Sequence, residues 1–511
     1  MIIERRKNAI RNVTSGITLR MLELCVPFLM RTVIIHFLGL EYAGLNGLFT
    51  SILQVLNMTE LGVGSAMVYS MYQPVAEDDS RQICALMNLY KKYYRLIGCA
   101  VGILGLLLLP FLPKLVKSGV PSDLNVYILY IMYLGSTVLS YWLFAYKNAL
   151  LAAHQRNDVI SKVRLMVLML QYTIQVASVV WLQNYYAFLI AALAGQVIIN
   201  IFTAVAAHRL YPAYKAEGNL EKYVISQINR RISALFVVKV SNVIVSNVST
   251  LVISAFLGLT MLAIYQNYFT IITAVTGTIS IIYTAALAGI GNSIVLETKE
   301  KNLQDFYKMM FIISWIAGFC ACCFLCMFQP FISIWVGTEC LMEIEVVVCL
   351  CIYFYIYEMV RMLDTYKDAA GIWQKDRIRL LVTSVTNLVL NLLLVNLWGI
   401  IGVVLSTALS MLLVGMPWLI RNLFDEVFGS AGIGKCIRQM LLYAFVAAAV
   451  AGMTYGICSC IPAEGWMALL LRGIVCCVVP NVLYFMLFRK KAEFDYCRSI
   501  LMREFSRFIK R

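Results

Sequence analysis

Three basic side chains lie inside long apolar runs of the sequence. Arg20 and Arg31 belong to the run 13–38, and Lys239 belongs to the run 232–257. A charge within a membrane-spanning segment is costly and usually marks a functional site. Arg20 and Arg31 are eleven residues apart, so they share one helix face to within about 20°. Because guanidinium and ammonium groups both bind phosphate, these residues predict an anion-binding site.

Two carboxylic residues accompany this basic set. Glu23 lies three residues after Arg20, close enough on a helix to pair with it, and Glu60 lies in the second apolar run. We interpret both as gating or ion-coupling residues. Three basic groups against two acidic groups leave the predicted site with a net positive charge, which favours an anionic ligand.

Polar residues at three- and four-residue spacing extend the site to four apolar runs. Asn57, Asn242 and Gln266 are the amides that we predict to bind substrate together with the basic residues. Helix packing through small and hydroxyl residues is the alternative for each stripe, and it stays open for the run that holds Gln266. The stripe in that run consists of Gln266, Thr270, Thr273, Gly277, Ser280 and Thr284.

The composition shows which elements must position these residues. The chain has 511 residues, of which 61% are hydrophobic and 14% are charged, against roughly 25% charged in a soluble domain. This excludes a soluble enzyme and predicts an all-α polytopic membrane protein with about 14 transmembrane helices. The apolar runs are 13–38, 43–69, 96–112, 124–150, 165–182, 187–207, 232–257, 262–290, 311–334, 346–362, 380–397, 400–420, 441–461 and 467–488.

Charge asymmetry between the loops predicts the orientation. Lys and Arg gather in alternate loops and in both tails, whereas the intervening loops carry mostly Asp and Glu. The positive-inside rule therefore places the N- and C-termini in the cytoplasm. The same rule accounts for the net charge of +15, so we expect no nucleic-acid partner.

An internal repeat divides the chain into two lobes. Phe37-Leu38-Gly39-Leu40 recurs as Phe256-Leu257-Gly258-Leu259, and Tyr146-Lys147 recurs as Tyr366-Lys367 at nearly the same offset. Such a repeat of six helices is typical of transporters that alternate access between two bundles. We predict an N-terminal six-helix lobe at 1–210, a cytoplasmic linker at 211–231, a C-terminal six-helix lobe at 232–425, and helices 13 and 14 with a basic amphipathic tail at 426–511.

Cysteine and histidine usage predicts neither a metal site nor a cofactor. Most of the 16 cysteines lie within apolar runs, for example Cys322, Cys326 and Cys476. We interpret them as small packing residues. The chain has three histidines, too few to favour a zinc site.

The motifs of the first 115 residues resemble a known family. Leu38-Gly39-x-x-Tyr42-x-Gly44-Leu45, Glu60-Leu61-Gly62-x-Gly64-x-Ala66 and Tyr72-x-Pro74 resemble the bacterial polysaccharide flippases of the multidrug/oligosaccharidyl-lipid/polysaccharide exporter (MOP) superfamily. The resemblance covers the whole chain. It implies that an undecaprenyl-diphosphate-linked oligosaccharide crosses from the inner to the outer leaflet of the bacterial plasma membrane. The cavity would lie between the lobes, lined by spans one, two, seven and eight. A polysaccharide polymerase and glycosyltransferases are the implied partners.

Two other functions stay open at this point. A cation-coupled multidrug antiporter of the same superfamily would favour acidic and aromatic cavity residues, whereas the predicted site here is basic. A membrane glycan polymerase or ligase would need a sizeable outside loop or paired catalytic carboxylates, and the outside loops here are short.

Overall fold

The fold is all-α, as the sequence predicts. The computed structural model describes residues 5–57, 62–117, 120–429, 432–462, 465–491 and 493–494, and these residues form helices and no strand. The chain divides into two compact units, Met1–Ala263 and Ile264–Arg511.

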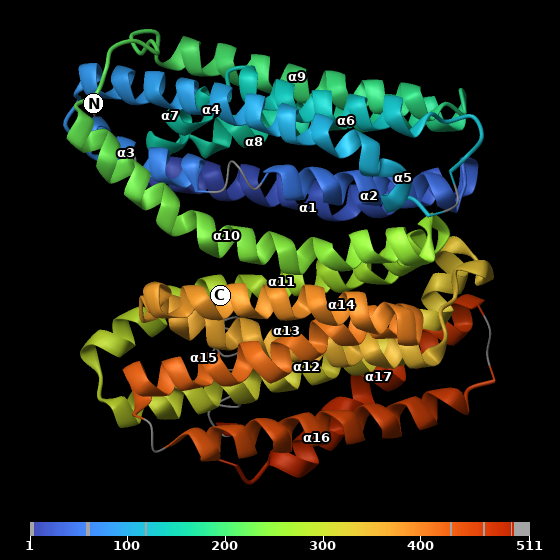
Figure 1. Ribbon diagram of the computed structural model, residues 1–511. Coiled ribbons are helices and arrows are strands. Elements are labelled where there is room, and N and C mark those ends of the chain that lie inside the picture. The colour runs from blue at the N-terminus through green and yellow to red at the C-terminus, as the bar shows by residue number, and fades with distance from the viewer. Residues whose placement is uncertain are drawn as a thin grey trace. The chain divides into compact units, whose positions relative to one another are not determined.

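The first unit is a helical bundle in which sequence-distant helices lie side by side. Helix α8 packs along both α1 and α9, and α10 packs mainly against α2. Figure 1 shows these helices coloured blue to green, with α1 and α9 running along nearly parallel lines and α10 curving into the same direction. The elements are α1 (Arg5–Phe37), α2 (Leu40–Leu56), α3 (Val63–Ala76), α4 (Ser80–Leu108), α5 (Leu112–Leu115), α6 (Val126–Trp142), α7 (Tyr146–Ala153), α8 (Asn157–Val180), α9 (Tyr185–Leu210) and α10 (Lys222–Leu257).

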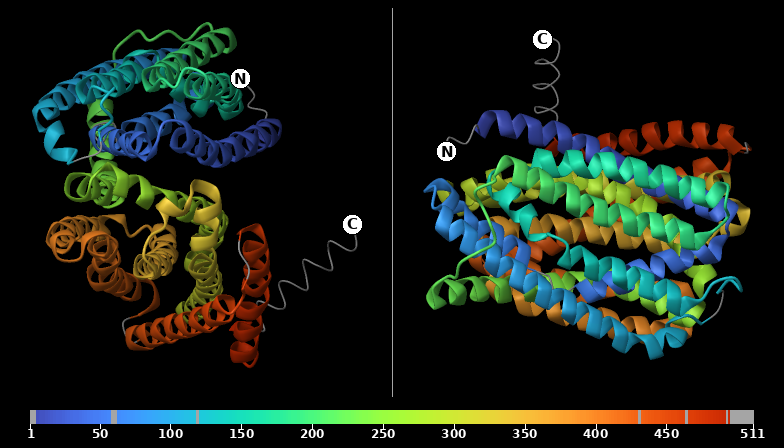
Figure 2. Two further views of the ribbon diagram at one scale, coloured as in Figure 1. Left: turned by 90° about the vertical axis from the view of Figure 1, so that its right-hand side faces the viewer. Right: turned by 90° about the horizontal axis from the view of Figure 1, so that it is seen from above.

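The second unit is a bundle built around α12. This helix packs against α13, α16 and α17, and Figure 2 shows the bundle, coloured yellow to red, from two further directions. Its elements are α11 (Leu259–Leu296), whose first turn still belongs to the first unit, α12 (Lys299–Val336), α13 (Ile344–Ala369), α14 (Trp373–Ser410), α15 (Met416–Leu423), α16 (Ile433–Ser459) and α17 (Gly465–Phe488).

The helices identify a multi-pass membrane protein. Among the described residues, 9 helical segments are long and apolar enough to cross a membrane, and the pair α6 and α7, bent by 51°, passes the same test together. Each predicted apolar run coincides with a helix or with a pair of helices. The run 43–69 is divided between α2 and α3, and α14 contains the runs 380–397 and part of 400–420 with a break at Gly399 (φ 55°). The count of fourteen crossings and the cytoplasmic termini stay predictions.

The repeated Phe-Leu-Gly-Leu motif is a turn between two helices. Gly39, two residues after the end of α1, has φ 119°, and Gly258, directly after α10, has φ 90°. Both values lie where only glycine is comfortable, and the next helix starts one residue later in each copy. The repeat assigns α10 to the second lobe, whereas its contacts assign it to the first compact unit. The predicted lobe boundaries therefore stay predictions.

Candidate functional site

One acidic and two basic side chains meet between α1 and α8. The Glu23 carboxylate lies 3.1 Å from the Arg164 guanidinium and 3.9 Å from that of Arg20. The exposed fractions of the side chains are 27% for Glu23, 60% for Arg20 and 51% for Arg164. This α1–α8 cluster (Arg20, Glu23, Arg164) carries a net positive charge, and both guanidinium groups keep donors accessible to a ligand.

Asn12 holds the two helices in register. Its side-chain Nδ2 donates to the Gln155 carbonyl at 3.0 Å, and its Oδ1 accepts from the backbone N–H of Asp158 at 2.7 Å. The N-terminus of α8 is therefore capped by a side chain from α1. The two helices pack against each other, and further along them Glu23 of α1 lies beside Arg164 of α8.

An apolar groove lies along the same two helices, and its first lining residues are Val26, three residues after Glu23, and Tyr172, eight residues after Arg164. It has a volume of about 410 Å³. Tyr172, in its wall, lies within electrostatic range of both Arg164 and Glu23. From Tyr172 to Trp181 the groove extends about 14 Å along α8. The lining residues are Val26, Leu29, Tyr172, Thr173, Val176, Ala177, Val180 and Trp181. Cations on the preceding turns of both helices, and apolar side chains along the groove, suit an amphipathic anion.

Arg31 lies at a different level of α1. Its Nη2 donates to the carbonyl of Ala263 at 2.5 Å. Eleven residues separate it from Arg20, which is about 16 Å along the helix axis. Arg31 therefore does not join the α1–α8 cluster, and its predicted contact with substrate stays a prediction.

The other predicted residues are placed as follows. The Asn57 Oδ1, directly after α2, accepts a hydrogen bond from the Tyr141 hydroxyl at 3.0 Å. Gln266 lies half-buried on α11. Lys239 and Asn242 lie on α10, but their side chains are outside the described part, and Glu60 is outside the described residues altogether. Of the predicted set, the structure brings Arg20 and Glu23 into contact.

The hydroxyl groups that follow Gln266 bond within their own helix. Each donates to a backbone carbonyl three or four residues earlier on α11, at 2.6–2.9 Å. This is the usual way for a hydroxyl group in a helix to satisfy its donor. The residues are Thr270, Thr273, Ser280 and Thr284.

A family model described as "Polysaccharide biosynthesis protein" matches residues 9–288. This is more than half of the chain and includes the whole α1–α8 cluster. The chain belongs to the polysaccharide biosynthesis protein family. No curated protein matches it.

Several solved structures are similar to this family member in fold. It is similar to the lipid II flippase MurJ in an inward closed conformation, with a TM-score of 0.63 and 12% identity over 93% of this chain and 99% of that chain. It is also similar to an inward-facing multidrug resistance MATE family transporter of the MOP superfamily, with a TM-score of 0.63 and 14% identity over 83% and 99%. A MOP superfamily transporter from Pyrococcus furiosus Vc1 matches with a TM-score of 0.51 and 14% identity over 81% and 95%. These similarities show that the chain shares the fold of these structures.

A buried carboxyl group of this family member was missed by sequence reasoning. Glu358 on α13 is 1% exposed, and the Tyr283 hydroxyl donates to its Oε2 at 2.7 Å. Its Oε1 is buried and has no hydrogen-bond partner among the described residues. The sequence signal that identified Arg20 was also present for Glu358, which is a charged residue inside an apolar run, 346–362.

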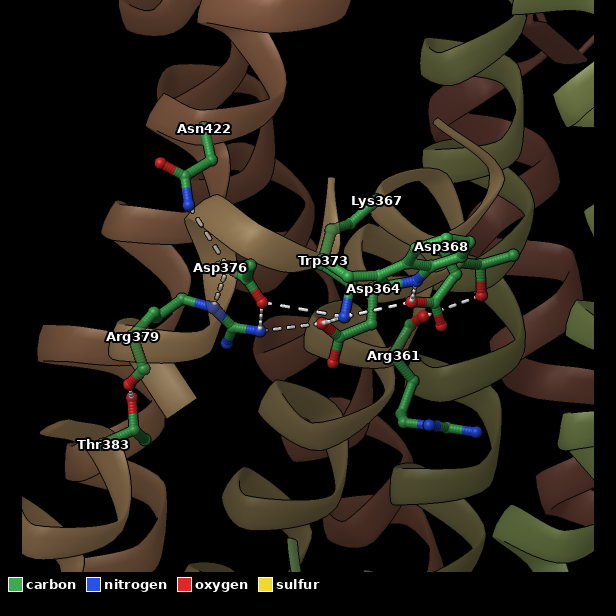
Figure 3. Close-up of polar contacts among 10 residues, drawn as sticks. Arg361, Asp364, Lys367, Asp368, Trp373, Asp376, Arg379, Thr383 and Asn422 are labelled. Carbon is green, nitrogen blue, oxygen red and sulfur yellow. Dashed lines mark hydrogen bonds and ion pairs between the residues drawn. The ribbon is translucent and has the colours of Figure 1, made fainter. Parts of the chain in front are cut away.

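A second cluster of charged residues links helices α13, α14 and α15 (Figure 3). Arg379 contacts Asp376 at 2.6 Å and Asp364 at 2.9 Å. Lys367 lies 3.4 Å from Asp364 and 3.6 Å from Asp376, and Asn422 donates to Asp376 at 3.2 Å. Lys367 also lies 3.1 Å from the exposed Asp368, so two buried cations face three carboxylates. We assign this α13–α14 ion network (Asp364, Lys367, Asp376, Arg379) a structural role, because each of its charges has an oppositely charged partner within the protein.

Proposed function

We propose that the protein flips an undecaprenyl-diphosphate-linked oligosaccharide from the inner to the outer leaflet of the bacterial plasma membrane. The observation that carries this proposal is the α1–α8 cluster with the apolar groove beside it. Arg20 and Arg164 bind the diphosphate, since guanidinium groups bind phosphate oxygens in pairs. The groove takes the first part of the prenyl chain. The resemblance to a lipid II flippase supports the same class of cargo.

Glu23 takes the place of the anionic cargo diphosphate while the site is empty. In the empty site its carboxylate holds both arginines. An incoming diphosphate carries more charge than one carboxylate, so it displaces Glu23 and takes over both guanidinium groups. Arg31, Lys239, Asn57, Asn242 and Gln266 bind the cargo at other points of its path, and Glu60 acts with Glu23 in gating or ion coupling. The termini are cytoplasmic, and a polymerase and glycosyltransferases act on the same glycan.

Glu23→Gln is expected to change the pH dependence of flipping. In the wild type, a proton added to Glu23 removes the negative charge that pairs with Arg20 and Arg164. A glutamine at this position is always neutral, so this source of pH dependence should disappear. Flipping measured in liposomes at a series of pH values tests this. Glu77→Gln, an exposed carboxylate that contacts Gln73, is the control, and an identical profile in the wild type and Glu23→Gln would contradict the role of Glu23.

The membrane potential is expected to drive flipping without ATP. The diphosphate is anionic and moves outward, away from the negative cell interior. Each unit charge gains about 2.3 kcal/mol at 100 mV, so two charges gain about 4.6 kcal/mol. This corresponds to a leaflet ratio of roughly a thousand at about 1.4 kcal/mol per decade. The sequence contains Gly429-x-x-x-x-Gly434-Lys435, but Cys436 stands where a nucleotide-binding P-loop requires Ser or Thr, so the motif is incomplete.

Reconstitution in liposomes with an imposed potential of either sign tests this proposal. The purified chain should move a diphosphate-linked lipid glycan towards the positive side at fixed pH and sodium. Failure to move any lipid-linked glycan under either potential would contradict the flippase function. Movement that ignores the potential would contradict only the electrical driving force.

One observation favours an alternative function for this chain, that of a cation-coupled multidrug antiporter. The buried Glu358 carboxyl, with one oxygen lacking a partner among the described residues, is suited to hold a proton or a cation. Export of a cationic dye by the purified chain, lost in Glu358→Gln, would favour this function over the flippase.

A further inference from the structure

Four buried thiols converge in the interior of the second unit. Cys322 and Cys326 come from α12, Cys458 from α16 and Cys476 from α17, and each is at most 2% exposed. The three helices pack against one another. The Sγ atoms of Cys322, Cys326 and Cys476 all lie within 4.8 Å of one another. Residues from three helices thus bring nucleophilic sulfur atoms to one point.

The geometry of this thiol triad (Cys322, Cys326, Cys476) is close to that of a metal site. The centre of a triangle with 4.8 Å edges is about 2.8 Å from each corner (4.8 divided by √3), against about 2.3 Å for a metal–thiolate bond. Each sulfur would need to move inward by about half an ångström at most. Cys322 and Cys326 are four residues apart, so both project from the same face of α12.

The triad differs from other cysteines of this chain in its contacts. Cys340 and Cys460 donate to a backbone carbonyl four residues earlier, at 3.5 and 3.3 Å. The Sγ atoms of the triad instead lie within 4.8 Å of one another, on three different positions of α12 and α17. A lone cysteine in a helix is satisfied by its own backbone and acts as a small apolar residue. Three thiols directed at each other have the arrangement of a ligand set.

We propose that the thiol triad binds one thiophilic metal ion, Cu(I). The donors are sulfur atoms, and Cys323 and Met327 pack against the same cluster. Soft thiolate and thioether ligands select Cu(I). Each thiol that becomes a thiolate ligand releases one proton, and the Cu(I) charge offsets one of the negative charges formed. No oxidation is required, because the ion enters and stays as Cu(I). This site is independent of the flippase function.

Titration of the purified full chain in detergent with Cu(I) under a reducing agent tests the proposal. A competing Cu(I) chelator removes weakly held ion, and metal analysis gives the stoichiometry. We expect one retained Cu(I) per chain, a new ultraviolet thiolate-to-copper absorption and a higher unfolding temperature in the presence of the ion. The double variant Cys322→Ala with Cys476→Ala should lose all three effects.

The matched control is the double variant Cys340→Ala with Cys436→Ala. These two cysteines are also 0% exposed in the second unit, as are Cys322 and Cys476, but lie outside the thiol triad. The control should retain Cu(I) as the wild type does. Absence of chelator-resistant Cu(I) in the wild type would overturn the proposal, and so would equal retention by the triad variant. If the triad variant does not fold, the wild-type stoichiometry and absorption still decide the question.

Discussion

Replacing both Arg20 and Arg164 with glutamine is expected to reduce glycan flipping by at least a hundredfold while the protein still inserts into the membrane. Hydrogen bonds to a charged partner contribute about 1.5–3 kcal/mol each, so loss of one from each arginine removes about 3–6 kcal/mol. At about 1.4 kcal/mol per decade this is a hundredfold to ten-thousandfold. Both side chains are more than half exposed, so the fold should tolerate the change.

The readout is the leaflet accessibility of a diphosphate-linked lipid glycan in liposomes that contain the purified variant. Lys162→Gln is the matched control, because Lys162 also lies on α8 and is 53% exposed, but pairs with Asp158. Flipping by the control should stay within a few-fold of the wild type. Normal flipping by the Arg20 and Arg164 double variant would refute the anion site, and loss of insertion would show that the arginines are structural.

Arg164 shows why sequence reasoning found only part of the α1–α8 cluster. The apolar run of its helix begins at residue 165, so Arg164 counted as a cytoplasmic positive charge. Helix α8 begins seven residues before it, at Asn157. Hydropathy locates the apolar part of a helix but not its ends. Glu23 was found because its partner Arg20 lies on the same helix, three residues away.

The helical architecture was predictable because its signals are local. Apolar runs of about 20 residues predict spans, and the repeated Phe-Leu-Gly-Leu motif marks the turns at Gly39 and Gly258. The bend between α6 and α7 was missed. The bend lies at Leu143 and Phe144. Phe144 has φ 56°, a backbone conformation that a phenylalanine does not predict.

Contacts between distant helices carry no comparable sequence signal. The cysteines of α12 and α17 looked like separate packing residues, because nothing in their spacing shows that Cys326 and Cys476 face one another. The α13–α14 ion network was missed for a related reason. Its members were counted as loop charges, whereas Asp376 and Arg379 lie buried in the first two turns of α14.

Arg379→Met is expected to lower the free energy of unfolding by about 3–5 kcal/mol, the usual effect of removing one partner of a buried ion pair. Arg379 is 2% exposed, and its guanidinium holds both Asp376 and Asp364. Without it, Lys367 alone faces Asp364, Asp368 and Asp376, and the buried Asp376 carboxylate loses its shortest ion pair. Lys375→Met is the control, since Lys375 pairs with Glu426 at the surface, where such pairs contribute about 0–1 kcal/mol.

A second substitution separates the charge effect from the loss of packing. Asp376→Asn in the Arg379→Met background removes the uncompensated charge and keeps the size of the side chain. If electrostatics dominate, denaturant unfolding in micelles should show the double variant to be more stable than Arg379→Met alone. If the methionine only packs badly, the double variant should be no better, because Asn422 would also lose an acceptor carboxylate oxygen at Asp376. A stability of Arg379→Met equal to that of Lys375→Met would contradict the structural role of the network.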